Sequence, residues 1–159
     1  MKKKFSHLTK NGEPAMVDVS EKGISHRLAI ARSIVILAPE ILEQFKKDEI
    51  HTKKGPVFQT AILAGIMASK KTGELIPLCH SLALDKCKVS INLNEQQEVE
   101  IICKVKTSAK TGVEMEALTG ASIAALTIYD MCKGFSHHII IKETRLIEKT
   151  GGKNDFKIT

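Results

Sequence analysis

An apolar repeat between residues 118 and 132 constrains the fold of this chain more than any other feature of its sequence. Its members recur at alternating intervals of three and four residues: Leu118, Ala121, Ala125, Ile128 and Cys132. This spacing places their side chains on one face of an α-helix. Because an apolar helix face must be buried, the repeat predicts a long helix packed against a core.

Two alternating segments precede this helix. They cover residues 86–93 and 98–106, and the polar run Asn-Glu-Gln-Gln occupies residues 94–97 between them. Alternation of apolar and polar residues with a period of two is typical of strands that bury one face. The sequence therefore predicts a β-hairpin with its turn at 94–97.

The other segments complete a mixed plan. Runs rich in β-branched residues predict strands over 27–37 and 137–147. Proline at a first helical position predicts a short helix over roughly 39–48 and a second helix from Pro56, with a basic loop over 51–56. The resulting order, β-α-α-β-β-α-β, predicts an α+β fold: a ferredoxin-like antiparallel sheet with an additional helix.

The second helix carries a face of small residues, Ala61, Ala64, Gly65 and Ala68, at helical spacing. Small side chains allow the backbone of another element to approach closely. A neighbouring subunit is one candidate for that element.

Length and composition favour one domain. With 159 residues, of which 43% are hydrophobic, the chain can bury a core without disulfides. We interpret residues 1–159 as one domain, with an extended segment over 1–19, a turn at Asn11-Gly12 and a flexible basic tail over 149–159. No apolar run approaches the ~20 residues that span a bilayer, and the basic start lacks the apolar stretch of a signal peptide. We therefore expect a cytoplasmic protein without membrane contact.

The formal net charge of +6 points to an anionic partner. Lys53 and Lys54 precede Gly55, and Lys149 and Lys153 flank a glycine pair. An ammonium next to glycine lets both the side chain and backbone N–H groups reach one phosphate. A solvated run of charge is the commoner explanation for either group.

Several classes of function are not expected. The P-loop motif is absent from the sequence, which excludes a P-loop nucleoside triphosphatase. Aromatic residues make up 4% of the chain, too few for an RNA-binding sheet, so no nucleic-acid partner is expected. Cys79 and His80 are adjacent and point in different directions, and the four cysteines form no Cys-x-x-Cys pair. We expect reduced thiols and no metal site.

Three carboxylates stand beside apolar segments. Asp130 and Lys133 lie three residues apart and share a helix face, where a surface ion pair is the simpler explanation. Glu114 and Glu116 project to the same side only if residues 111–116 are extended and the helix starts near Ala117. Otherwise both are ordinary acidic residues of a first helical turn.

Three motifs together resemble the cyclic pyranopterin monophosphate synthase family of molybdenum cofactor biosynthesis. They are Leu-Ile-Pro-Leu-Cys-His at 75–80, Lys-Thr-Gly-Val-Glu-Met-Glu-Ala-Leu-Thr at 110–119, and Leu-Thr-Ile-Tyr-Asp-Met-Cys-Lys at 126–133. Residues 16–20 and 149–153 also resemble that family, so the similarity covers nearly the whole chain. Ser81 and Gly120 depart from it, where proline and alanine are expected.

The resemblance implies an enzyme, a lyase that acts on (8S)-3′,8-cyclo-7,8-dihydroguanosine 5′-triphosphate. Its products would be cyclic pyranopterin monophosphate and diphosphate. The family forms homohexamers, trimers of dimers with sites at subunit interfaces. No required cofactor is implied, although Mg²⁺ could accompany the triphosphate.

The resemblance also implies roles for individual residues. Asp130, Lys54 and Lys133 match catalytic positions. The positions expected to contact the purine-derived ring are Leu78, Cys79, His80, Glu114, Met115 and Glu116. Arg27 and Lys149 match basic positions near the triphosphate, and Lys153 is a weaker candidate for the same task.

Mutual repulsion between clustered lysines would lower their pKa values, so one could transfer a proton near neutral pH. In this hypothesis Asp130 orients Lys133, and Lys54 shuttles a proton while the purine ring opens and closes again. A sugar-derived hydroxyl then attacks the α-phosphorus and expels diphosphate. The alternative hypothesis is a non-catalytic nucleotide-binding module on a ferredoxin-like scaffold.

Overall fold

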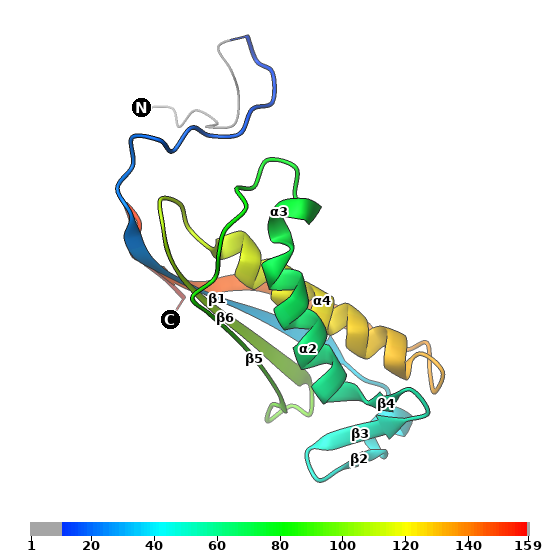
Figure 1. Cartoon of the computed structure of the whole chain (residues 1–159). Helices are drawn as coiled ribbons and strands as arrows, with labels where there is room; N and C mark the ends of the chain where they lie inside the picture. The colour runs from blue at the N-terminus through cyan, green and yellow to red at the C-terminus, as the bar shows by residue number, and fades with distance from the viewer. Residues whose placement is uncertain (1–10, 159) are drawn as a thin grey trace.

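Strands from both halves of the chain form one antiparallel sheet. The computed structural model describes residues 11–158. The sheet order is β5-β6-β1-β7-β8, with bounds Lys86–Leu93, Val99–Ala109, Ser25–Ile36, Ile140–Thr150 and Phe156–Lys157. The central strand β1 pairs antiparallel with β6 and β7, and β5 pairs with β6 as a hairpin (Figure 1). This arrangement confirms the ferredoxin-like α+β fold and the hairpin.

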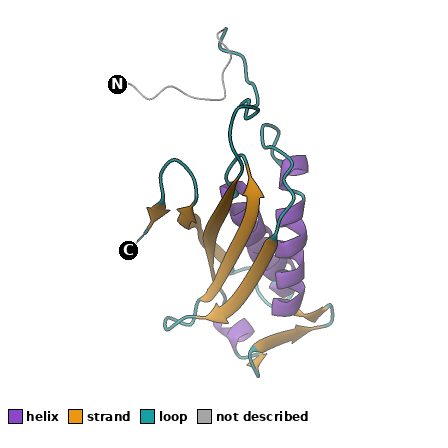
Figure 2. Cartoon of the chain, turned by 60° about the vertical axis from the view of Figure 1, so that its left-hand side comes forward, coloured by secondary structure: helices purple, strands orange, loops and turns teal. Residues whose placement is uncertain are grey.

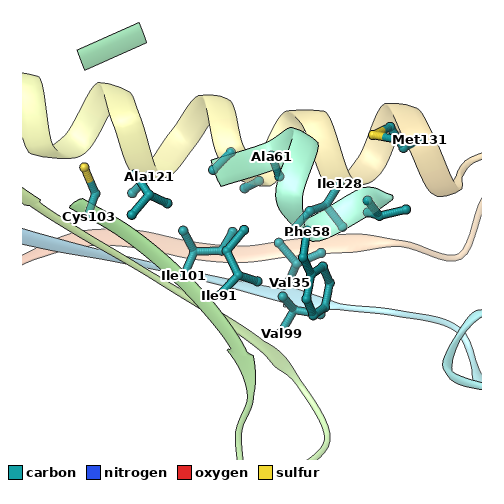
Figure 3. Packing of buried hydrophobic residues seen from close by; sticks show 14 of the residues in the cluster. Val35, Phe58, Ala61, Ile91, Val99, Ile101, Cys103, Ala121, Ile128 and Met131 are labelled. Carbon is teal, nitrogen blue, oxygen red and sulfur yellow. The ribbon is translucent and has the colours of Figure 1, made fainter. Parts of the chain in front are cut away.

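Two long helices cover one face of the sheet (Figure 2). They are α2, Val57–Lys70, and α4, Glu114–Cys132. The predicted apolar repeat lies on the covered side of α4: Ala121, Ala125, Ile128 and Cys132 are buried, and Leu118 packs against the same core. Figure 3 shows Ala121 and Ile128 above the buried side chains of the strands.

The small-residue face of α2 packs against α4 of the same chain. A side chain at Gly65 would meet the carbonyl oxygen of Gly120 at 2.8 Å. At Gly120 a Cβ would collide with Ser69 Oγ and would lie 2.6 Å from Cys103 Sγ. The departure from alanine at Gly120 thus has a physical reason, because other side chains occupy that space. Ala61, Gly65 and Ala68 are buried within the chain, so this face does not require a neighbouring subunit.

A small second sheet replaces most of the helix predicted over 39–48. Helix α1 covers only Pro39–Leu42, and β2, Phe45–Lys46, turns into β3, Glu49–Thr52. Lys47 and Asp48 form this turn with φ angles of 50° and 62°, which end a right-handed helix. The basic segment 51–56 is not a simple loop either, because β4, Gly55–Pro56, pairs with β3.

A buried carboxylate anchors this small sheet to α2. Glu49 accepts hydrogen bonds from the backbone N–H groups of Phe58 at 2.8 Å and Gln59 at 3.1 Å, in the first turn of α2. These donors have no partner within the helix, and the helix dipole also favours a negative charge at this end. The hairpin that follows Glu49 is therefore held against the helices.

Other segments also differ from the sequence-based expectations. The final strand runs over 140–150 instead of 137–147, and β8 pairs with its end, so part of the predicted tail belongs to the sheet. A further short helix, α3, covers Thr72–Leu75. The turn at Asn11-Gly12 is confirmed, with a φ of 82° at the glycine. Residues 1–10 of the predicted extended segment lie outside the described residues.

Candidate active site

Two lysines converge on one carboxylate at the C-terminal end of α4. Asp130 Oδ2 lies 2.7 Å from Lys54 Nζ, and Asp130 Oδ1 lies 2.8 Å from Lys133 Nζ. Lys54 also donates to the backbone oxygen of Asp130 at 3.2 Å. We call these three residues the charged trio. The structure brings together all three residues that the sequence placed in catalytic roles.

The β3–β4 turn positions Lys54. Gly55 has a φ of 112°, a conformation that side-chain-bearing residues rarely adopt. Thr52 Oγ1 accepts a hydrogen bond from the backbone N–H of Lys54 at 3.1 Å, which fixes the turn internally. Asp130 belongs to the last turn of α4, and Lys133 is the residue that ends the helix. The trio therefore combines a turn and a helix end that different parts of the chain supply.

Contacts within the trio shift the pKa values of Asp130 and Lys133. Hydrogen bonds from Lys133 and then Lys54 lower the pKa of Asp130 to about 2. The same contact with Asp130 raises the pKa of Lys133. The expected lowering of lysine pKa values is thus wrong for Lys133 in this chain, because a carboxylate lies between the two ammonium groups. All three side chains are about half exposed, and exposed pairs add little stability.

A pocket of about 400 Å³ opens beside the trio. Apolar parts of Met131 and Phe135 line it together with the charged groups. Phe135 is 44% exposed, so an apolar surface stays accessible at this pocket. An apolar wall next to a few convergent charges is the usual form of a small-molecule site.

A second, basic pocket of about 180 Å³ lies at the other end of α4. Its cations come from distant segments: Lys22, Arg27, Lys110, Lys149 and Lys153. Lys149 Nζ is paired with Glu114 Oε1 at 3.0 Å. Within the described residues the buried Nε of Arg27 has no hydrogen-bond partner. We call this group the basic cradle. It contains both basic residues assigned to the triphosphate, and the weaker candidate Lys153.

Gly151 shapes the turn that follows β7, next to the cradle residues Thr150 and Gly152. Its φ is 83°, and a Cβ there would collide with the backbone oxygen of His26. Only glycine lets the turn after β7 approach β1 this closely. The neighbouring Gly152 lies against the guanidinium of Arg27, because a Cβ would be 3.1 Å from its terminal nitrogen. The sequence feature Lys-Thr-Gly-Gly-Lys thus builds one wall of the cradle.

The acidic pair lies on the first turn of α4, so the helical alternative holds for these residues and not the extended one. Helix α4 starts at Glu114, where two carboxylates favour the positive end of the helix dipole. Glu114 faces the cradle, whereas Glu116 is only 4% exposed. Burial, and to a lesser degree the charge of Glu114, raises the pKa of Glu116. The two carboxylates therefore do not point into one cleft.

Cys79 and His80 lie near the same helix end. Burial and the charge of Glu116 raise the pKa of the Cys79 thiol, which makes it a poor nucleophile. His80 Nε2 lies 2.8 Å from the backbone oxygen of Val17. Because a carbonyl only accepts, this nitrogen carries the proton. Leu78 is half-buried, and Met115 is exposed beside the acidic pair.

Within one chain, the charged trio lies far from the residues assigned to substrate binding. Glu114 and Asp130 are 16 positions apart on α4, a distance of about 24 Å along a helix. Figure 1 shows the β3–β4 turn at one end of α4 and α3 at the other. The residues assigned to catalysis and those assigned to substrate binding are therefore on opposite ends of the same molecule.

A family model described as the MoaC family matches residues 16–152. The chain belongs to the MoaC family. All residues of the charged trio and both matched cations of the cradle fall within the matched range, whereas Lys153 lies just beyond it.

Relatives of this MoaC chain carry names from one biosynthetic route. It is 55% identical to a molybdenum cofactor biosynthesis bifunctional protein of Synechocystis, over 98% of the chain and 46% of that protein. It is 49% identical to molybdenum cofactor biosynthesis protein 1 of Dictyostelium discoideum, over 94% of the chain and 26% of that protein. It is 47% identical to a cyclic pyranopterin monophosphate synthase of Xanthomonas axonopodis, over 96% of the chain and 92% of that protein. The chain thus spans less than half of the first two relatives and most of the third.

Some lining residues of this MoaC chain were not foreseen from its sequence. Met131 and Phe135 line the trio pocket, and Lys22 and Lys110 line the basic cradle. Lys110 lies in a Lys-Thr-Gly motif and Phe135 follows Lys133 by two residues, so both had a local signal. Lys22 had none, because only the folded chain brings it next to β7.

Neither a metal-binding cluster nor a membrane-spanning helix occurs within residues 11–158. No three His, Cys, Asp or Glu side chains there are close enough to hold a metal ion. None of the described helices is long and apolar enough to cross a bilayer.

Proposed function

We propose that this chain is a cyclic pyranopterin monophosphate synthase of molybdenum cofactor biosynthesis. Its substrate would be (8S)-3′,8-cyclo-7,8-dihydroguanosine 5′-triphosphate, and its products cyclic pyranopterin monophosphate and diphosphate. The observation that carries this proposal is the charged trio beside a pocket of about 400 Å³. The name of the Xanthomonas relative, a cyclic pyranopterin monophosphate synthase that the chain covers almost completely, supports it.

The active site is assembled from two subunits of a homohexamer, a trimer of dimers. In this arrangement the basic cradle of one subunit faces the charged trio of its neighbour. The separation of about 24 Å within one chain supports this arrangement, because neither group alone holds both the cradle cations and the proton-transfer groups. Any Mg²⁺ in the site enters bound to the triphosphate. The protein acts in the cytoplasm.

Each group has a distinct task. Lys133 enters the reaction protonated, because Asp130 raises its pKa, so it serves as a general acid. Lys54, which contacts the same carboxylate, relays the proton while the purine ring opens and closes. A sugar-derived hydroxyl then attacks the α-phosphorus, the bond to the bridging oxygen breaks, and diphosphate leaves with that oxygen. Arg27 and Lys149 neutralise its charge.

Incubation with the cyclised triphosphate tests this function. We expect the wild-type protein to release diphosphate and the pterin product in equal amounts, and the Asp130→Ala variant to release neither. Binding of the triphosphate without turnover by the wild-type protein would instead indicate a non-catalytic nucleotide-binding module. Calorimetry of both proteins with the same ligand separates binding from turnover.

A further inference from the structure

Four lysines form a compact square on the sheet face that the helices leave open. They come from two neighbouring strands: Lys86 and Lys88 from β5, and Lys104 and Lys106 from β6. The register places Lys86 directly opposite Lys106 and Lys88 directly opposite Lys104. Opposite residues have Cβ atoms about 5 Å apart, and alternate residues of one strand lie about 7 Å apart. All four side chains are exposed.

The square is electrostatically unfavourable for the isolated fold. Like charges directly opposite each other destabilise a sheet, and this pairing occurs twice in succession. Among the described residues, none of the four ammonium groups forms an ion pair or a side-chain hydrogen bond with a carboxylate. Like charges that face each other without an ion-pair partner are expected at functional sites, where a ligand can neutralise them.

Protection of a sheet edge explains only half of the square. Lysines on an edge strand discourage pairing with other chains, and β5 is an edge strand. Lys104 and Lys106, however, lie on β6, which is paired on both sides. Their charges protect no edge, so a different reason is needed for them.

The surroundings limit the size of a ligand. The four lysines alone line a hollow of about 270 Å³. Acidic residues border the square: Asp85 directly precedes Lys86, and Glu100 lies four residues before Lys104 on β6. Asp85 accepts a hydrogen bond from Ser108 at 2.8 Å, and Glu100 lies 3.7 Å from Arg32. Carboxylates at both ends would repel a long polyanion that runs across the face.

We propose that this lysine square is a second anion site, which binds a compact oligophosphate: free diphosphate or triphosphate, or the phosphate tail of a nucleotide. Four convergent ammonium groups match the multiple negative charges of such a group. The site shares no residue with the charged trio or with the cradle cations, and it does not depend on the function proposed above.

Site-resolved labelling of lysines tests this proposal with the full chain. The probe is inorganic tripolyphosphate, and the readout is the rate at which an amine-acetylating reagent modifies each lysine, measured by mass spectrometry. At ten times the dissociation constant we expect the four lysines to react about tenfold more slowly. Lys46 and Lys47, which are exposed on the β2–β3 turn, provide internal controls and should keep their rates at matched ionic strength.

Paired variants supply the second control. In Lys88→Gln/Lys104→Gln the remaining Lys86 and Lys106 should lose their protection, whereas Lys46→Gln/Lys47→Gln removes the same charge and should retain it. Guanosine triphosphate in place of tripolyphosphate distinguishes a nucleotide tail from the free anion, and protection by either supports the site.

Three results would overturn the proposal. The first is an equal slowing of all exposed lysines, which indicates nonspecific screening. The second is an unreactive square before any anion is added, which indicates a subunit interface. The third is protection by an oligonucleotide but not by tripolyphosphate, which indicates a nucleic-acid surface.

Discussion

Lys54 Nζ lies 2.7 Å from Asp130 Oδ2, although the two residues are 76 positions apart in the chain. The β3–β4 turn delivers the lysine, and the end of α4 delivers the carboxylate. Glu49 holds the turn against the helices, so the contact depends on how the small sheet is anchored.

Replacement of Asp130 by Ala should lower turnover by about a hundredfold or more, because general acid–base groups typically contribute that much. The carboxylate is exposed, and among residues 11–158 it bonds only the two lysines of the trio, so the fold and the oligomer should persist. Circular dichroism and light scattering check the fold, and product release checks turnover. Near-normal turnover in a folded variant would remove Asp130 from the mechanism.

Lys54→Arg and Lys133→Arg should lower kcat by orders of magnitude with little change in KM. Arginine keeps the positive charge but cannot give up its proton in a protein, so it preserves electrostatic binding and abolishes proton transfer. Steady-state kinetics of both variants separate these effects. A raised KM with an unchanged kcat would show that the lysines only hold the substrate.

The acid side of the pH–rate profile should not report Asp130. Its pKa is lowered to about 2, so the carboxylate stays ionised at any pH where the enzyme is assayed. For a lowered pKa, the ion pairs are complete above the ordinary value of 3.8 and are lost as the pH falls through about 2. A carboxyl titration followed by NMR checks this value. Titration of Asp130 near 5 would show that the trio is not formed in solution.

Gly120→Ala should destabilise the protein by about 1–3 kcal/mol, because the added methyl group collides with Ser69 Oγ and crowds Cys103 Sγ. Combination with Ser69→Ala should restore part of this loss by removing the oxygen. Thermal unfolding of the single and double variants measures both effects. If Gly120→Ala alone leaves the melting temperature unchanged, the close contact of α2 and α4 is not as described.

Periodic segments of the sequence were the most predictable parts of this structure. The repeat in α4 and the alternation in β5 and β6 report burial directly, and they led to the ferredoxin-like order. The helix predicted over 39–48 was wrong because Lys47 and Asp48 adopt positive φ angles. The segment contains no glycine that would have indicated such a turn. The sequence left open whether Glu114 and Glu116 were extended or helical, and the structure places both in the first turn of α4, where the helix dipole favours their charges.

The site was predictable only in part. The sequence motifs identified the candidate site residues, and the structure shows that Lys54 and Lys133 both contact Asp130. Their separation from the basic cradle follows from the length of α4, and no motif encodes it. In the proposed assembly, the partner of each half belongs to another subunit, so no pattern within one chain brings the two halves together.

Complementation between inactive variants tests the two-subunit site most directly. One variant is Asp130→Ala, and the other carries Arg27→Ala and Lys149→Ala. When they are coexpressed in equal amounts, random assembly of a symmetric oligomer leaves both halves intact in about one site in four, so about a quarter of wild-type activity should return. A mixture of Asp130→Ala with Lys133→Ala is the control: both lesions lie in the same half, and it should stay inactive. Mixed oligomers without recovered activity, or a monomeric wild-type protein, would contradict a site shared between subunits.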